Sequence, residues 1–158
     1  MTRYMITTLV SLALVICLSF LLLFSKSQAK YNQAEKEAVD LVSYDYDVKQ
    51  VKNFYWSTTD ATYFSLDFID QDLQERYAII PQEGGEVRYF DREEFITLEQ
   101  AQEIAANDYQ PVKFLETRLS LLNHEPVWEV TIKNDNNTIT YYYLNAYNGE
   151  WVKKIENV

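Results

Sequence analysis

The sequence predicts an α+β protein in which an N-terminal transmembrane helix is followed by two tandem subdomains, each a helix packed on an antiparallel four-stranded meander. Three observations lead to this prediction. An uncharged apolar run lies near the start of the 158-residue chain. A repeat of about 64 residues organises the remainder. Within each repeat, strand patterns follow one another without the crossover helices that a parallel sheet requires.

The apolar run covers residues 4–25, which are 22 residues without a charge, between Arg3 and Lys26. About 20 apolar residues, rising about 1.5 Å each, cross the hydrocarbon layer of a bilayer. We therefore expect residues 1–3 to form a short cytoplasmic tail and residues 4–25 to anchor the chain in the lipid bilayer.

The sequence around the apolar run does not by itself decide whether this segment is cleaved or which way it is oriented in the membrane. Residues 27–29, Ser-Gln-Ala, weakly resemble a signal-peptide cleavage site, although the apolar run exceeds the about 7–15 residues of such peptides. Positive charges after the span, beginning with Lys26 and Lys30, outnumber Arg3 before it, which by itself argues against an external C-terminus. No Cys follows Cys17, which is compatible with an extracytoplasmic domain.

The helix that spans the membrane is expected to continue into the first subdomain. Neither Gly nor Pro occurs before Pro81, so nothing local breaks a helix over residues 5–44, which would be about 60 Å long. We assign residues 26–93 to this helical stalk and the first subdomain, and residues 94–158 to the second subdomain.

The repeat is visible when the chain is compared with itself at offsets of 63 and 64. The coinciding positions are Ala38, Leu41, Val42, Asp45 and Tyr46 with Ala101, Ile104, Ala105, Asp108 and Tyr109, and Gly85-Glu86 with Gly149-Glu150. The apolar members have the spacing of three and four that places them on one helix face. Residues 97–100, Thr-Leu-Glu-Gln, form a capping box that begins the second helix.

Strands follow each helix with a period of two. Phe64, Leu66 and Phe68 alternate with polar residues, and Trp128 and Val130 do the same in the second repeat. This alternation is typical of a sheet with one covered face. Polar and Gly-containing turns separate the strands at residues 57–60, 82–85, 123–126, 134–137 and 147–149.

Composition excludes several classes of site. The chain has a net charge of −10, one His, one Cys and three Gly. These counts leave no material for a His/Cys metal cage, a disulfide scaffold or a glycine-rich phosphate loop. A nucleic-acid partner is also excluded, because it requires clustered Lys and Arg. We predict no cofactor, no metal and no nucleic acid.

Catalytic residues are not predicted either. His124 lies in an expected hairpin turn, where it would be solvated, and no Gly-x-Ser-x-Gly motif accompanies the serines. Asp67, Asp70 and Asp72 could hold Ca²⁺ weakly, but the EF-hand pattern is absent and a solvated hairpin tip is the favoured interpretation. The chain is therefore expected not to be an enzyme.

Aromatic residues supply the candidate binding surface. Two runs place rings on both faces of an expected strand: Phe54, Tyr55 and Trp56, and Tyr141, Tyr142 and Tyr143. Exposed Tyr and Trp are favoured interface anchors. The alternative is that both faces pack between the subdomains. An open sheet edge or an aromatic groove would suit an extended protein segment added as a strand.

The second repeat resembles a PepSY-type domain, in which a short helix precedes a hairpin and an Asp-Ala-x-x-Gly-Glu turn closes the sheet. The residues that carry the resemblance are Thr97-Leu98-Glu99-Gln100-Ala101, Val127-Trp128-Glu129-Val130 and Leu144-Asn145-Ala146-Tyr147-Asn148-Gly149-Glu150-Trp151. The family turn is represented by Asn145, Ala146, Gly149 and Glu150, with Asn145 in place of Asp. Asn and Gly tolerate positive φ, so we expect the turn to be retained.

With its anchor and tandem arrangement, the whole chain resembles the YpmB-like family, the cell wall elongation regulators of the TseB type. The resemblance implies two cystatin-like subdomains outside the membrane of a Gram-positive bacterium, a penicillin-binding transpeptidase as partner, and no catalytic residues. It thus implies a single-pass membrane protein with its C-terminal domains extracytoplasmic. The alternative function is a PepSY-type peptidase inhibitor or folding aid at the cell surface.

Overall fold

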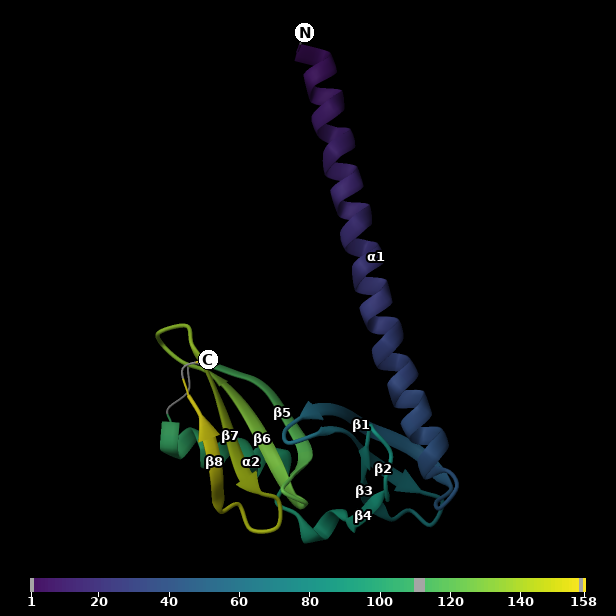
Figure 1. Cartoon of the computed structure of the whole chain (residues 1–158), viewed down its shortest axis with the longest axis vertical. Coiled ribbons are helices and arrows are strands. Elements are labelled where there is room, and N and C mark those ends of the chain that lie inside the picture. The colour runs from purple at the N-terminus through teal and green to yellow at the C-terminus, as the bar shows by residue number, and fades with distance from the viewer. Residues whose placement is uncertain (1, 110–112, 157) are drawn as a thin grey trace. The chain divides into compact units, whose positions relative to one another are not determined.

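The computed structural model describes residues 2–109, 113–156 and 158. The chain divides into two compact units, Met1–Glu37 and Ala38–Val158. The first unit is helical in its described residues, and the second contains the eight strands found in the described part of the chain (Figure 1). The α+β class predicted from the sequence is confirmed.

Helix α1, Thr2–Val42, is a single helix of 41 residues. It ends two residues before the expected limit, because Ser43 and Tyr44 already belong to a turn in which the Tyr44 amide donates to the Leu41 carbonyl at 3.2 Å. By length and composition, its segment Thr8–Val42 can cross a membrane, and its most apolar stretch is not buried against any described part of the chain. The N-terminal apolar helix is thus confirmed.

The first sheet has four antiparallel strands in chain order, β1 (Val48–Thr58), β2 (Thr62–Asp70), β3 (Glu75–Pro81) and β4 (Arg88–Asp91). This order is the predicted meander. The helix of this repeat is the end of α1, where Ala38 and Val42 are buried. Ala38 and Val42 lie in the same compact unit as the strands.

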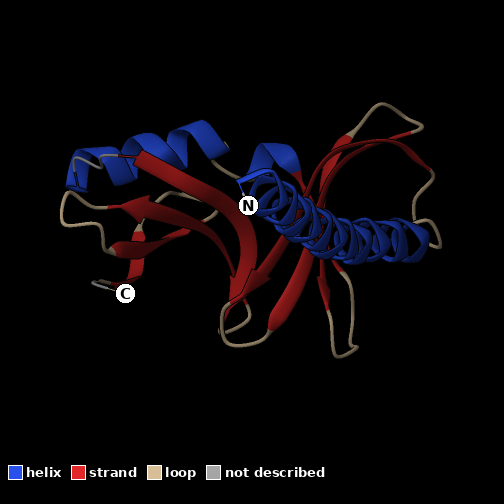
Figure 2. Ribbon diagram, turned by 90° about the horizontal axis from the view of Figure 1, so that it is seen from above, coloured by secondary structure: helices blue, strands red, loops and turns tan. Residues whose placement is uncertain are grey.

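The second sheet repeats the arrangement with β5 (Lys113–Leu122), β6 (Glu125–Lys133), β7 (Ile139–Asn145) and β8 (Trp151–Ile155), again in chain order. Helix α2 (Leu98–Tyr109) packs on β5 and β6 (Figure 2).

The capping box that begins α2 is present as predicted. The Gln100 amide donates to Thr97 Oγ1 at 3.2 Å, and the Thr97 amide donates to Gln100 Oε1 at 2.8 Å. These two bonds satisfy helix-end groups that would otherwise lack partners. A 3₁₀ turn, η1 (Arg92–Glu94), connects the two sheets. The division into subdomains at residues 93 and 94 stays a prediction, since both sheets belong to one compact unit.

Strand positions reproduce the repeat. Strand β2 begins at Thr62 and β6 at Glu125, which is 63 residues later. Strand β3 begins at Glu75 and β7 at Ile139, which is 64 residues later. Equivalent strands therefore occupy equivalent places in the two sheets.

Both sheets contribute to one hydrophobic core. Trp128 of β6 is fully buried and meets the ring of Tyr55 edge-on, with centroids 5.9 Å apart, and that of Tyr77 at 6.0 Å. Its indole N–H donates to the Ile96 carbonyl at 2.9 Å. Tyr77 in turn stacks on Phe95, with centroids 5.5 Å apart. A ring of the second sheet is thus enclosed by rings of the first.

The expectation of one covered face per sheet is wrong. The polar residues that alternate with the apolar ones are also buried, among them Ser65 and Asp67 of β2 and Glu129 and Thr131 of β6. Ser65 shows the reason, because its hydroxyl donates to the Leu119 carbonyl of β5 at 2.9 Å. The sheets pack against each other, and part of the polar face of each is covered by the other.

Candidate interaction surface

The six aromatic candidates divide into core and surface residues. Tyr55 belongs to the common core, and so does Tyr142, whose hydroxyl donates to Asp108 of α2. Burial, followed by the bond and charge of Asp108, raises the pKa of Tyr142 to about 12. Phe54 is buried beside Phe64, with ring centroids 5.8 Å apart. The side chains of these three candidates are therefore buried inside the fold.

The other three candidates meet in one groove. Trp56 of β1 and Tyr141 and Tyr143 of β7 line an open groove of about 550 Å³. The remaining lining residues are Thr58, Thr59, Arg118, Leu122, Glu129, Lys153 and Ile155. The groove thus brings together rings from the two runs that the sequence singled out, contributed by both sheets.

Strand pairing explains why Tyr141 and Tyr143, but not Tyr142, line the groove. Successive side chains of a strand point to opposite faces. Tyr142 faces the core and α2, so its neighbours face the other way. Tyr143 pairs with Lys153 and Tyr141 pairs with Ile155, which places these β8 residues on the groove face as well.

The groove contains an ion pair between a buried acid and a half-buried arginine. Glu129 is 1 % exposed and accepts a charge-assisted bond from Arg118 Nη2. Arg118 Nη1 also donates to the Trp56 carbonyl at 3.1 Å, which ties β5 to β1. Burial, together with the negative charge and hydrogen bond of Glu129, raises the pKa of the Tyr143 hydroxyl. Arg118 and Glu129 therefore hold β1, β5 and β6 together at the floor of the groove.

The residues that line the groove are of the kinds that bind another protein. The lining of this open groove offers aromatic rings with polar tips, two threonine hydroxyls, and the two cations Arg118 and Lys153. Among the described residues that line the groove, none is a His, Cys or Ser. Aromatic and Arg side chains of this kind anchor protein interfaces.

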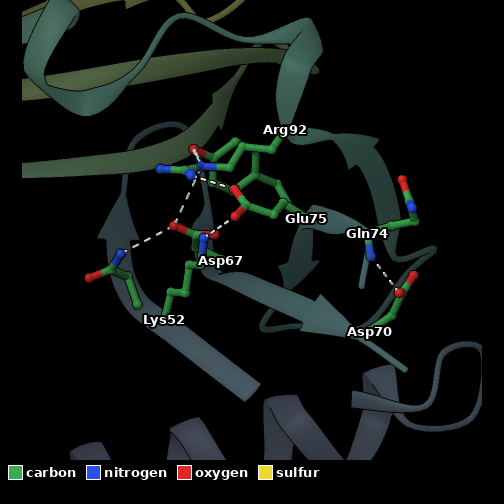
Figure 3. A network of polar contacts seen from close by, with 8 residues as sticks. Lys52, Asp67, Asp70, Gln74, Glu75 and Arg92 are labelled. Atoms are coloured by element: carbon green, nitrogen blue, oxygen red, sulfur yellow. Dashed lines mark hydrogen bonds and ion pairs between the residues drawn. The ribbon is translucent and has the colours of Figure 1, made fainter. Parts of the chain in front are cut away.

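A second polar cluster joins the first sheet to η1 (Figure 3). Glu75 accepts from Lys52 and, at 2.5 Å, from Arg92 Nη1, and these bonds hold the pKa of Glu75 below its usual value. Arg92 Nε lies 3.9 Å from the buried Asp67, whose second oxygen, Oδ1, has no hydrogen-bond partner in the described structure. Burial raises the pKa of Asp67 despite these contacts. The cluster connects three strands to the linker.

The acidic residues considered as Ca²⁺ ligands do not come together at one site. Asp70 accepts from the Gln74 amide and from Arg76 Nε, each at 2.9 Å, whereas Asp67 bonds Asn53 at 3.2 Å. Within the described residues, no three acidic, His or Cys side chains gather as a metal site would require. His124 is exposed in the β5–β6 turn, as expected, with φ of 67°.

The family turn between β7 and β8 is built by side-chain caps. Asn145 Oδ1 accepts from the Tyr147 amide at 2.9 Å, a role that an Asp carboxylate would also fill. The Ala146 amide donates to the Pro126 carbonyl at 2.9 Å, and its own carbonyl accepts from Ile96 at 2.8 Å. Gly149 adopts φ of 73°, and the Glu150 amide donates to the Asn148 side chain at 2.9 Å. The turn therefore positions β8 and supports the segment before α2.

Sequence reasoning missed Arg118 and Glu129. Their only signal is cross-strand: two opposite charges fall in register on adjacent strands of an expected hairpin.

Residues 95–154 match the family described as "Peptidase propeptide and YPEB domain", or PepSY. The match runs from just before α2 into β8, so the second repeat is similar to a PepSY domain, in agreement with the resemblance that the sequence predicted.

The fold of the chain is similar to that of the "YpmB protein from Bacillus subtilis", with a TM-score of 0.68 and 18 % sequence identity. This similarity covers 77 % of the present chain and 95 % of that chain. At this identity the likeness shows the fold, and it confirms the predicted resemblance. No curated protein matches the chain.

Proposed function

We propose that the chain is a non-enzymatic, membrane-anchored, extracytoplasmic regulator of cell wall elongation that acts by binding a penicillin-binding transpeptidase. The observation that carries the binding role is the groove in which Trp56, Tyr141 and Tyr143 meet. Tyr and Trp bury much area at little cost in conformational entropy, and the ion pair of half-buried Arg118 with buried Glu129 holds their surroundings in place.

The anchoring role is supported by α1. A helix with this length and this exposed apolar surface is stable in a lipid bilayer, where its backbone groups are satisfied internally. A signal sequence would have similar features, so retention of the helix in the mature protein is part of the proposal. The extracytoplasmic position of the C-terminus is likewise part of the proposal.

The identity of the partner rests on the family resemblance. A likeness to YpmB in fold and a PepSY domain support a protein of that kind, and the wall-synthesis role comes from the resemblance to the TseB-type regulators.

Crosslinking in living Gram-positive cells tests the binding role. A photo-reactive amino acid at Thr58, an exposed residue that lines the groove, should capture a membrane protein that also reacts with a labelled penicillin. The same probe at Glu83, exposed in the β3–β4 turn, should not. If Thr58 captures no penicillin-reactive protein and deletion of the protein leaves elongation normal, the proposed partner is wrong.

Topology is tested separately with reporters fused after Val158, one active only outside the cytoplasm and one active only inside it. Activity of the internal reporter would exclude a wall-related role.

One observation favours a second function, inhibition of a peptidase or assistance in its folding. The family that matches residues 95–154 is described partly by peptidase propeptides. Assay of the full-length chain against secreted and membrane peptidases distinguishes the two functions, because a regulator of a transpeptidase should inhibit none of them.

A further inference from the structure

The two sheets have four outer strands, β1, β4, β5 and β8. Strands β1 and β5 lie against each other, joined by Ser57 and Ser120, whose hydroxyls are 2.7 Å apart. Strand β4 has four residues, and Tyr89 on it bonds Asp45 and meets the ring of Tyr46 at 4.8 Å. No described strand pairs with the outer side of β8.

Strand β8 is exposed along its whole length. Three of its five residues are apolar, with exposed fractions of 57 % for Trp151, 39 % for Val152 and 39 % for Ile155. Proteins usually shorten, cover or charge such an edge, because its unpaired backbone groups can template another strand. An edge that is open and apolar is therefore a binding surface in its own right.

The charge of β8 indicates what it binds. The unit that contains it, residues 38–158, has 10 Lys and Arg against 22 Asp and Glu, a balance of −12. Yet β8 carries two adjacent lysines and no acid. Lys153 pairs with Tyr143 on the groove face, and Lys154 pairs with Tyr142 on the α2 face. A basic edge in an acidic unit attracts acidic side chains on either face of an added strand.

A second copy of the chain does not fit this edge. Two β8 strands paired antiparallel through their centres would place lysine opposite or diagonal to lysine, which is destabilising. The ion pair of Lys154 with Glu156, at 3.2 Å, is exposed and removes little of this repulsion. The same lysines that oppose self-pairing favour an acidic segment.

We propose that the outer edge of β8 accepts an extended segment of a partner protein, with alternating apolar and acidic residues, as a fifth strand of the second sheet. Main-chain hydrogen bonds supply affinity, and Lys153 and Lys154 select acidic side chains. Trp151 and Ile155 meet the apolar ones. Because Lys153 and Ile155 also line the groove, the added strand would extend its wall. This inference rests on the proposed function, in that it specifies how the regulator grips its partner.

The test uses the full-length chain in detergent micelles and a fluorescent octapeptide of alternating Val and Glu as the probe, with binding followed by fluorescence anisotropy. Saturable binding is expected, with Kd weakened at least about fivefold in the double variant Lys153→Glu/Lys154→Glu. The matched control is Lys49→Glu/Lys113→Glu, which changes net charge equally at exposed positions outside β8 and should bind like the wild type.

Two further peptides examine the wild-type chain, so the outcome does not depend on folding of a variant. A peptide with Lys in place of Glu should not bind. A Val-Glu peptide N-methylated at every residue keeps its side chains but has no backbone N–H to donate along either edge, and it should bind weakly. Binding of the basic peptide, equal binding of the methylated peptide, or an unchanged Kd in the β8 variant would each overturn the proposal.

The outcome is separable from that of the proposed function. If the peptide fails to bind while the Thr58 probe still captures a transpeptidase, strand addition at β8 is wrong and the regulator remains. If the peptide binds β8 as expected but no transpeptidase is captured, the edge is a binding site and the proposed partner is wrong.

Discussion

The hydroxyl of Ser57 lies 2.7 Å from the hydroxyl of Ser120, and the two residues are separated by 63 positions, the offset of the internal repeat. Ser57 lies in β1 and Ser120 in β5, the first strand of each repeat. Equivalent positions of the two repeats therefore touch where the sheets meet. Both side chains are fully buried, so the pair belongs to the interior of the interface.

Replacing Ser57 with Ala should destabilise the chain by about 1 kcal/mol, because Ser120 loses a buried partner. Urea unfolding of the full-length chain, followed by tryptophan fluorescence, measures this loss. Ser43→Ala, which removes an exposed hydroxyl that bonds a carbonyl of its own helix, is the control and should cost less. A loss no larger than that of the control would mean that the Ser57–Ser120 bond adds nothing to the interface.

Removing Arg118 should be costlier. Arg118→Met leaves Glu129 buried without its cation, and we expect a loss of about 3 kcal/mol in the free energy of unfolding. The double variant Arg118→Met/Glu129→Leu should recover much of the loss, because no unpaired charge remains. Equal losses in the single and double variants would argue that packing of the Arg118 side chain, rather than charge compensation, stabilises this site.

Gly149 and Gly84 form a matched pair for the turn. Both have positive φ, 73° and 89°, but a Cβ on Gly149 would lie 2.5 Å from Ile104 Cδ1, whereas one on Gly84 meets nothing within 4 Å. Gly84→Ala should cost about 1 kcal/mol from backbone strain alone. Gly149→Ala should cost about 1–2 kcal/mol more, from the clash with α2. Thermal unfolding of the two variants side by side measures the difference.

Asp67 and Asp70 should respond to pH in opposite directions. Burial raises the pKa of Asp67, so the stability it contributes is present below its unfolded pKa and lost as pH rises through the folded value. Asp67→Asn should therefore gain on the wild type as pH rises from about 4 to 7. Arg76, through a hydrogen bond, lowers the pKa of Asp70, so Asp70→Asn should lose relative to the wild type over the same range. Urea unfolding at several pH values measures both, and parallel pH profiles for the two variants would contradict the assignment.

The strand order could be predicted from the sequence because alternation and turn residues are local signals. The Thr97–Gln100 capping box and the turn at Gly149 were predictable for the same reason. What covers each face was not predictable. Ser65 and Glu129 have the pattern of solvent-facing residues, and only the packing of one sheet on the other buries them.

The candidate surface was predictable in part. Alternation alone separates Tyr142 from Tyr141 and Tyr143, but it does not say which set faces the core. Trp56 comes close to the rings of β7 because β1 and β5 lie side by side, a contact between distant parts of the chain that no local pattern encodes. The open edge of β8 likewise depends on which strands end up outermost.

Trp128 of the second sheet is enclosed by Tyr55 and Tyr77 of the first sheet. The limits of the PepSY match, residues 95–154, are therefore not the limits of a unit that folds by itself. A fragment excised at residues 95–154 would bare the indole and the strand β5 that Ser57 and Ser65 now shelter. Neither repeat has a complete hydrophobic core by itself, so we expect the two repeats to fold together.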